Sequence, residues 1–465
     1  MSNVTAPELQ ENKMGTMPVG KLLFTMALPL AISMLVQAFY NVVDSFYVSR
    51  ISESAVTALG LAFPIQHLMI GCATGIGVGM NALLSKSLGE GNQERANRAA
   101  GNGIFLSLCF VLAFMVFGFV GARPYYAVQS SVQETVENGT AYVTICSIFC
   151  LGIFVEIIGE RLLQASGRTV YTLFTQGLGA VLNIVLDPVF IFGSDKLGIA
   201  PMGIAGAAVA TVVGQWVAAI MAIIFNFTSN PDVQLKLRFL CPQPKIIKKI
   251  LTVGIPSIIM MAIGSVMNFG MSQILLGFKD YGETAAGVFG IYFKLQSFVL
   301  MPLLGINNAS IPILAFNYGA RKPERITKLL KCALGTATVI MLVGLGVFQL
   351  LTDQLLGIFE PSETFLTLGR SALRIVSIHF PIAVVGICLS ACFQALGNGV
   401  YSTIVSLCRQ LIALLPVAFL LSLTGDVHAV WWAFPIAEVV SSVTSVILFA
   451  RIYKNKIKPL SDSAA

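Results

Sequence analysis

Charged residues are scarce in this chain. Asp, Glu, Lys and Arg make up 11% of its 465 residues, whereas hydrophobic residues make up 56%. Too little polar surface is left to cover a water-soluble protein of this length, so the composition excludes a soluble globular fold. It predicts an integral membrane protein made of helices, because a helix satisfies its own backbone hydrogen bonds in hydrocarbon.

Residues and motifs of common catalytic and metal sites are also few. The chain has three His and no phosphate-binding loop, His-Glu-x-x-His motif or nucleophile elbow. Its nine Cys lie almost entirely in apolar segments, and an odd number gives no disulfide framework, so they are interpreted as small hydrophobic residues. We expect no cofactor and no ATP hydrolysis. An intramembrane enzyme would need a polar catalytic cluster at one membrane face, and this class is disfavoured.

The chain contains much of its own sequence twice. Residues 53–60 (ESAVTALG) reappear as 283–290 (ETAAGVFG), and the same offset of 230 relates Gln66 to Gln296 and Gly75 to Gly305. Pro29 pairs with Pro256 at an offset of 227. A duplicated hydrophobic half is typical of membrane transporters.

Glycines recur every four residues inside the second apolar span, at Gly71, Gly75 and Gly79. A phosphate loop would need a strand before the glycines, which this segment lacks. The spacing therefore predicts a smooth ridge on which another helix packs closely.

Twelve apolar stretches are each long enough to cross about 30 Å of hydrocarbon as a helix. They cover residues 20–47, 56–84, 98–121, 139–164, 170–192, 203–227, 248–278, 286–315, 327–352, 367–396, 401–424 and 429–452. Six spans fall in each repeat, and because six is even both repeats enter the bilayer in the same direction. We expect an all-α membrane fold of two pseudo-symmetric six-helix lobes. Its parts are a tail at 1–19, an N-terminal lobe at 20–228 (helices 1–6), a linker at 229–247, a C-terminal lobe at 248–452 (helices 7–12) and a tail at 453–465.

The 29 Lys and Arg residues predict the orientation of the chain. Lys294 and Arg409 lie inside spans and are expected to be buried. Of the others, 21 fall on the side of the two termini and 6 on the opposite side. Cytoplasmic loops are rich in Lys and Arg, so we expect a multi-pass plasma-membrane protein with both termini in the cytoplasm. The net charge of +7 then reflects topology, and no nucleic-acid partner is expected.

Acidic residues within spans are concentrated in the first half. Asp44 lies in span one, Glu156 and Glu160 in span four and Asp187 in span five, whereas the repeat partners of the two Asp residues are apolar. Ionisable groups are costly in hydrocarbon and usually face a cavity or a partner. The first lobe is therefore the expected place of ion chemistry.

Helical spacing lets these acids share one site with an amide. Asn183 lies one turn before Asp187 on the same face of its helix, and Asn41 lies close to Asp44. Neighbouring carboxylates can hold a proton, and carboxylates with an Asn carbonyl can ligate Na⁺, so both ions fit the predicted site. The alternatives are helix bridging for the two Asp residues and, for Glu160, an ion pair with a nearby Arg.

Further polar residues within spans are candidates to line a substrate cavity: Gln66, Gln296, Lys294, Arg409 and Glu438. Arg409 and Glu438 carry opposite charges, and a structural ion pair between them is an equal alternative. His379 is interpreted as a packing residue. Pro29 is the candidate hinge, because its helix also carries Asp44.

These motifs together resemble the multidrug and toxic compound extrusion (MATE) transporters, in particular their bacterial DinF-like branch. The resemblance covers essentially the whole chain. It rests on duplicated Gly-(x)5-Arg loops after spans two and eight and on four short motifs: Asn41-Val-Val-Asp44, LNIVLDP at 182–188, Gln164-Ala-Ser-Gly167 and Gln394-Ala-Leu-Gly397.

The resemblance implies two lobes that face a central cavity, a coupling-ion site at Asp44, Asn183 and Asp187, and bending of span one at Pro29. It also implies export of cationic or amphipathic drugs in exchange for H⁺ or Na⁺. We therefore predict a monomeric antiporter in the lipid bilayer that works by alternating access. The alternative is a flippase or exporter of a lipid-linked or anionic metabolite, with Lys294 and Arg409 in contact with the substrate.

Overall fold

The computed structural model describes residues 12–279, 281–359 and 362–462, and it describes the backbone alone at Asn41, Ser45, Ser49, Glu53, Ser461 and Asp462. Within this part of the chain the secondary structure is helical, apart from one isolated β-bridge between Ser194 and Ile199. The predicted all-α membrane fold is confirmed.

The N-terminal lobe contains six spans. They are α2 (Val19–Ser49), α3 (Glu53–Gly89), α4 (Gln93–Val120), the pair α6 (Gln133–Ile148) and α7 (Leu151–Ala165), α8 (Val170–Phe192) and α9 (Ile204–Ser229). Short helices α1 (Lys13–Thr16) and α5 (Ala122–Gln129) precede α2 and α6.

The C-terminal lobe repeats this order. Its spans are α10 (Pro244–Leu276), α11 (Gly282–Gly319), α12 (Pro323–Leu350), the pair α14 (Glu363–Ser377) and α15 (Phe380–Ala395), the run α16 (Gly399–Leu407), η3 (Cys408–Leu414) and α17 (Leu415–Ser422), and α19 (Ala433–Ile452). Shorter elements are η2 (Leu237–Phe239), α13 (Thr352–Gly357), α18 (Val427–Val430), η4 (Tyr453–Ile457) and α20 (Lys458–Asp462). Ten helices of the described chain are each long and apolar enough to cross a membrane, and two bent pairs raise the number to twelve, as predicted.

The fourth and tenth spans are bent, which the sequence analysis did not anticipate. In each, two helices meet at an angle of 47°. Pro381 lies in the first turn of α15, where its missing N–H prevents the ladder of α14 from continuing. Both spans end alike, because Gly167 and Gly397 adopt positive φ angles of 80° and 76° just beyond α7 and α15.

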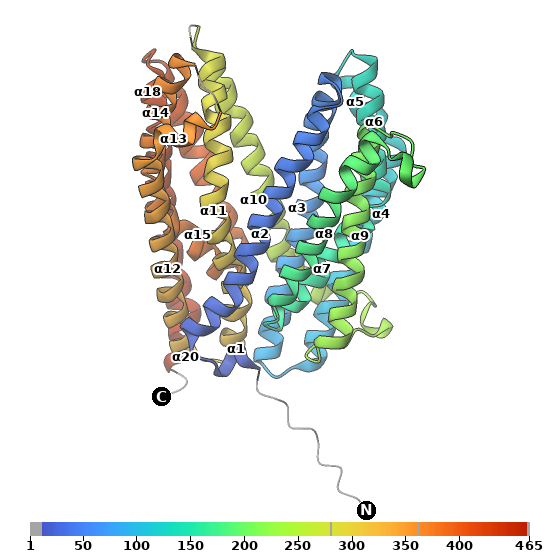
Figure 1. The fold of residues 1–465 in the computed structure, drawn as a ribbon. Coiled ribbons are helices and arrows are strands. Elements are labelled where there is room, and N and C mark those ends of the chain that lie inside the picture. The colour runs from blue at the N-terminus through green and yellow to red at the C-terminus, as the bar shows by residue number, and fades with distance from the viewer. Residues whose placement is uncertain (1–11, 280, 360–361, 463–465) are drawn as a thin grey trace, which may run out of the picture.

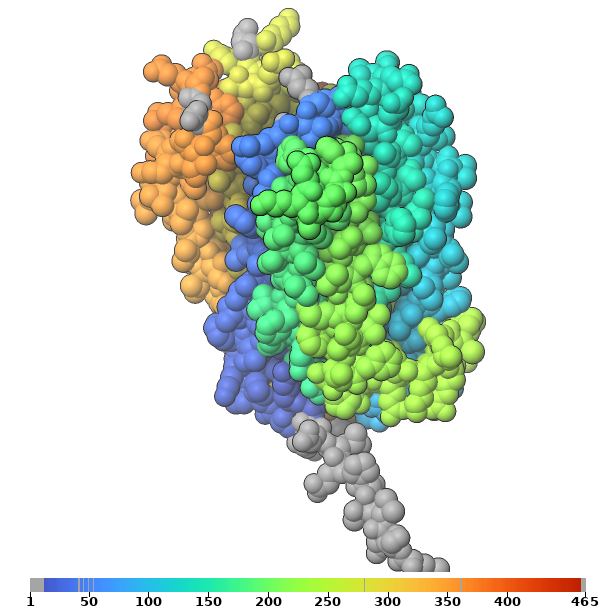
Figure 2. Space-filling model, turned by 45° about the vertical axis from the view of Figure 1, so that its right-hand side comes forward, coloured from blue at the N-terminus to red at the C-terminus, as the bar shows by residue number. Residues whose placement is uncertain are grey.

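The two lobes meet at one end of the molecule and diverge toward the other. Figure 1 shows them converging near α1 and α20 and spreading apart toward α5 and α13. We call these the closed end and the open end. In Figure 2, α2 lies along the seam between the C-terminal lobe and the rest of its own lobe.

Glycines of α3 pack against α10 at the closed end. A Cβ atom on Gly75 would lie 2.5 Å from Cγ1 of Ile258, and one on Gly79 would lie 2.2 Å from the carbonyl oxygen of Ile250. These distances are too short for any side chain, so only glycine permits the contact. The predicted packing ridge is confirmed.

The second repeat makes the matching contact between α11 and α2. A Cβ atom on Gly305, the repeat partner of Gly75, would lie 2.7 Å from the backbone nitrogen of Ala31. Nearer the open end, no described atom of another helix lies within 4 Å of the Cβ position on Gly60 of α3 or on that of its partner Gly290 of α11. The lobes are therefore in contact at the closed end and apart at the open end.

Candidate functional site

Three of the predicted ion-site residues lie together in the N-terminal lobe. Asn183 and Asp187 are buried on one face of α8, and the Nδ2 of Asn183 donates hydrogen bonds of 3.3 Å to Oδ1 of Asp187 and to Oγ1 of Thr211 in α9. The negative charge of Asp44 in α2 repels that of Asp187. Asn41 lies one turn before Asp44, and its side chain is outside the described part of the structure.

The oxygen atoms of this group are not fully satisfied. Oδ1 of Asp44, Oδ2 of Asp187 and Oδ1 of Asn183 are buried, and none accepts a hydrogen bond from a described residue. No described Lys or Arg forms an ion pair with either Asp. Buried carboxylate oxygens without a donor or a counter-charge are costly. The arrangement suits a small bound cation better than a helix bridge.

Two tyrosines belong to the same region and were missed in the sequence analysis. Tyr40 interacts electrostatically with Asp44, Asp187 and Glu156. The hydroxyl of Tyr142 in α6 accepts a 2.9 Å hydrogen bond from Nε2 of Gln66. The position of Tyr40, one turn before Asp44 on the same helix, was the signal available in the sequence.

Glu160 is hydrogen-bonded to α8 and forms no ion pair with a described arginine, although the charge of the adjacent Arg161 acts on it. Thr175 donates a 2.6 Å hydrogen bond to its Oε1, and Nε2 of Gln176 donates one of 2.9 Å to its Oε2. Arg168 instead pairs with Asp232 at 3.4 Å. The ion pair considered for Glu160 is therefore absent among the described residues. Glu156, one turn earlier on α7, interacts electrostatically with Glu160.

Arg409 and Glu438 form an ion pair inside the C-terminal lobe. Nη1 of Arg409, in the π-helix η3, lies 3.7 Å from Oε1 of Glu438 in α19. Glu438 is buried. The pairing of opposite charges anticipated from the sequence is present.

Gln296 also points into its own lobe. It is buried, and its Nε2 lies 3.3 Å from Nε2 of His379. Nδ1 of His379 lies 2.6 Å from the carbonyl oxygen of Val376, so this nitrogen carries the proton and Nε2 accepts from the amide. Gln66 thus donates to the hydroxyl of Tyr142 and Gln296 to a ring nitrogen of His379, each within its own lobe.

Lys294 is exposed, which corrects the expectation that it is buried. It lies eleven residues before Gly305 in α11, which corresponds to three helical turns and about 16 Å along the same face. Gly305 contacts Ala31 of the opposite lobe. The face that carries Lys294 is therefore turned toward the space between the lobes.

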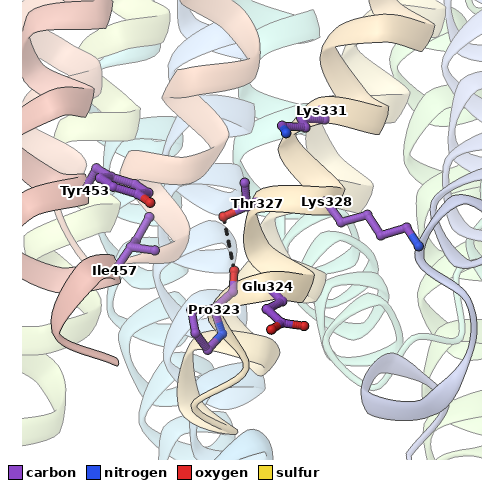
Figure 3. A pocket seen from close by; sticks show the side chains of 7 residues that line it. All are labelled: Pro323, Glu324, Thr327, Lys328, Lys331, Tyr453 and Ile457. Atoms are coloured by element: carbon purple, nitrogen blue, oxygen red, sulfur yellow. Dashed lines mark hydrogen bonds between the residues drawn. The ribbon is translucent and has the colours of Figure 1, made fainter. Parts of the chain in front are cut away.

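A separate pocket of about 380 Å³ lies at the closed end, between α12 and η4. Figure 3 shows its lining side chains, and none of them is a predicted site residue: Pro323, Glu324, Thr327, Lys328, Lys331, Tyr453 and Ile457.

Comparison with known proteins gives concordant matches. The model of the MatE family matches residues 29–189 and 256–420. The multidrug export protein MepA of Staphylococcus aureus (strain NCTC 8325 / PS 47) is 23% identical over 436 residues, 93% of each chain. MepA of Staphylococcus saprophyticus is 22% identical over 423 residues, 91% of each chain.

Two solved structures are similar over 97% of this chain and 99% of their own, each at 26% identity. One is a multidrug resistance MATE family transporter of the MOP superfamily in an outward-facing conformation, with a TM-score of 0.89. The other is a MOP superfamily transporter from Pyrococcus furiosus, described by the reverse polarity of its binding pocket, with a TM-score of 0.88. The two segments matched by the family model begin 227 residues apart, the offset that relates Pro29 to Pro256.

Proposed function

Because the chain belongs to the MatE family of transporters, we propose that it is a secondary active antiporter that exports cationic or amphipathic small molecules in exchange for H⁺ or Na⁺. That it is a multi-pass transporter of the plasma membrane, and not an enzyme, follows from the family and from its multidrug-export relatives. The coupling ion, the substrate charge and the monomeric state belong to the proposal.

The unsatisfied oxygens of Asp44, Asn183 and Asp187 carry this proposal. A proton or Na⁺ bound there neutralises carboxylate charge in a place without a described Lys or Arg partner. An organic cation held nearby by the same charge is then bound less tightly and leaves. The ion and the drug thus exclude one another, which is the basis of exchange.

The way the lobes touch supports alternating access as the mechanism. With both termini in the cytoplasm, the open end faces outward, as in the outward-facing transporter to which the chain is similar. Rocking of the lobes would separate the glycine contacts at the closed end and close the open end. We assign Asp44, Asn183 and Asp187 to the coupling ion, with Asn41, Glu156 and Glu160 as nearby members.

Helix α2 is placed to couple ion binding to this movement. It packs against both α11 of the opposite lobe and α8 of its own lobe. Pro29 interrupts its hydrogen-bond ladder, and the hydroxyl of Ser33 donates a 2.8 Å hydrogen bond to the carbonyl oxygen of Pro29. Bending at Pro29 would shift Asp44 relative to Asp187 on α8.

A second candidate function is the export of an anionic or lipid-linked metabolite. The exposed Lys294, turned toward the opposite lobe, favours it, because a cation there can bind an acidic group of a substrate. Arg409 is less available, since it pairs with Glu438.

The test is efflux of a fluorescent organic cation from liposomes under a pH gradient or a Na⁺ gradient alone. We expect wild type to respond to at least one gradient and Asp44→Asn and Asp187→Asn to lose about tenfold or more of the rate. Asp353→Asn is the matched control, because Asp353 lies exposed on α13, outside the spans, and already has a partner in Arg370. Efflux that survives both substitutions would refute the ion site, and inhibition by organic anions alone would favour the second candidate.

A further inference from the structure

A line of polar side chains runs through the N-terminal lobe from the ion site toward the closed end. It lies along α7 and α8 and consists of three groups. Hydrogen bonds of 2.6 to 3.4 Å join the members of each group. From the open end, the groups are Asn183 with Asp187, Glu160 with Thr175 and Gln176, and Thr172 with Gln164 and Arg161. We call this line the polar track.

Arg161 ends the polar track at the contact between the lobes. Its Nη1 donates a 3.0 Å hydrogen bond to Oε1 of Gln164 and one of 3.3 Å to Oδ1 of Asn308 in α11 of the opposite lobe. Its carbonyl oxygen accepts from Nδ2 of Asn81 in α3 at 3.1 Å. A Cβ atom on Gly77 of α3 would lie 2.7 Å from Cγ of Arg161, so glycine at this position makes room for the arginine. The guanidinium is therefore fixed where both lobes meet.

Arg161 forms no ion pair within the described part of the chain, although the charge of the adjacent Glu160 acts on it. Its side chain is buried, and no described carboxylate lies within the 4.0 Å of an ion pair. The neighbouring Glu160 turns away to Thr175 and Gln176 on α8. A neutral amide could make both hydrogen bonds of Nη1 without the cost of burying a charge. Neither hydrogen bond of Nη1 therefore requires the positive charge of Arg161.

We propose that Arg161 is the electrostatic barrier that prevents the coupling cation from leaking through the N-terminal lobe to the closed end. Acidic side chains draw cations into the upper part of the polar track, and a fixed guanidinium at its end repels them. An antiporter needs such a barrier, because a cation that crosses without substrate dissipates the gradient. This proposal rests on the proposed function only in taking H⁺ or Na⁺ as the ion that enters.

The hydrogen bond to Asn308 connects the barrier to the movement of the lobes. Asn308 lies one turn beyond Gly305, in the part of α11 that separates from α2 when the lobes rock. When Asn308 withdraws, the guanidinium loses its partner on the opposite lobe and can change position. Arg161 is thus held in its barrier position as long as the two lobes are in contact at the closed end.

The experiment measures ion leak in the absence of any substrate. Protein-containing liposomes with an internal pH dye, or loaded for ²²Na⁺ uptake, receive an imposed gradient with charge compensation by valinomycin and K⁺. We expect wild type to be tight, Arg161→Gln to leak about tenfold faster or more, and Arg161→Lys to remain tight because it keeps the charge. Arg168→Gln is the control, since Arg168 is half-buried and pairs with Asp232.

Two results would overturn the proposal. The first is an Arg161→Gln protein as tight as wild type, and the second is equal leak through Arg161→Gln and Arg161→Lys, which would indicate loss of packing and not loss of charge. If Arg161→Gln does not fold, as judged by thermal unfolding, Asn308→Asp decides: it places a carboxylate beside the guanidinium of Arg161, so faster leak is expected, and leak equal to that of wild type would refute the barrier. Because no substrate is present, these results stand apart from the efflux test, in which failure of Asp44→Asn and Asp187→Asn to reduce transport refutes the ion site.

Discussion

Gly89 of α3 lies directly against the backbone carbonyl of Phe316 in α11. A Cβ atom on Gly89 would come within 2.0 Å of that oxygen, and one on the repeat partner Gly319 would come within 2.2 Å of the carbonyl oxygen of Lys86. Phe316 and Lys86 are themselves 230 residues apart. The lobes thus meet at the closed end through two contacts that are related to each other by the offset of 230 between the repeats.

Alanine at Gly89 or Gly319 should push the closed end apart. Overpacking of a tight contact costs about 1–3 kcal/mol, so we expect a shift of the population away from the outward-open arrangement. Spin-label distances across the open end would report this as a larger fraction of short distances. Gly60→Ala is the control, because no described atom lies within 4 Å of its Cβ position. Equal distance distributions for all three variants would contradict the role given to the pair.

Asn183→Ala should separate the two possible coupling ions. The substitution removes Oδ1, a candidate Na⁺ ligand, and leaves the carboxylates of Asp44 and Asp187 for a proton. For a Na⁺-coupled protein we expect the apparent Na⁺ affinity to fall about tenfold, since one oxygen ligand is lost. For an H⁺-coupled protein, efflux driven by the pH gradient persists. Titration of efflux with Na⁺ at fixed pH measures the difference, and Thr228→Ala in the exposed last turn of α9 is a matched control.

The sequence predicts those features of the fold and of the site that are determined within a single helix. Glycines four residues apart form a ridge, and Asn183 with Asp187 share a face, whatever the surroundings of the helix. The bond between Arg161 and Asn308 joins residues 147 positions apart and depends on the register between two lobes, for which a single sequence has no signal. The exposure of Lys294 was missed for the same reason: a cation in an apolar span was assumed to be buried, whereas the span borders the space between the lobes.

Lys294 should affect the selection of substrates by charge. Its exposed ammonium, on the face of α11 that is turned toward the opposite lobe, attracts acidic groups and repels cationic ones. For Lys294→Gln we expect weaker competition by anionic or zwitterionic compounds, by about threefold to tenfold, with competition by monovalent organic cations unchanged or stronger. Inhibition of dye efflux by matched pairs of charged compounds measures this. Equal changes for both classes would argue against contact with the substrate.

The short helix α1 connects the two lobes across the closed end. Nη2 of Arg325 donates to the carbonyl oxygens of Met14, at 3.1 Å, and Met17, at 2.7 Å, while Met14 also lies against Gly167 of the N-terminal lobe. Arg325→Gln removes these bonds, so we expect faster hydrogen exchange in residues 12–17, equivalent to a loss of about 1–3 kcal/mol. Arg321→Gln, at an exposed neighbouring residue, should leave the exchange unchanged. Unchanged exchange in Arg325→Gln would show that α1 is held by its apolar contacts alone.

The docking of α1 should strengthen as the pH rises. Burial, and then the nearby charge of Arg168, lower the pKa of Lys13 below its ordinary value. A base whose pKa is lower in the docked state loses its proton more readily there, so docking releases protons and is favoured by higher pH, between the docked and undocked pKa values. We expect hydrogen exchange of residues 12–17, after correction for the intrinsic pH dependence, to become more strongly protected through this alkaline range. Lys13→Gln removes the titrating group and should abolish the dependence; a variant that retains the full dependence would place its origin in another residue.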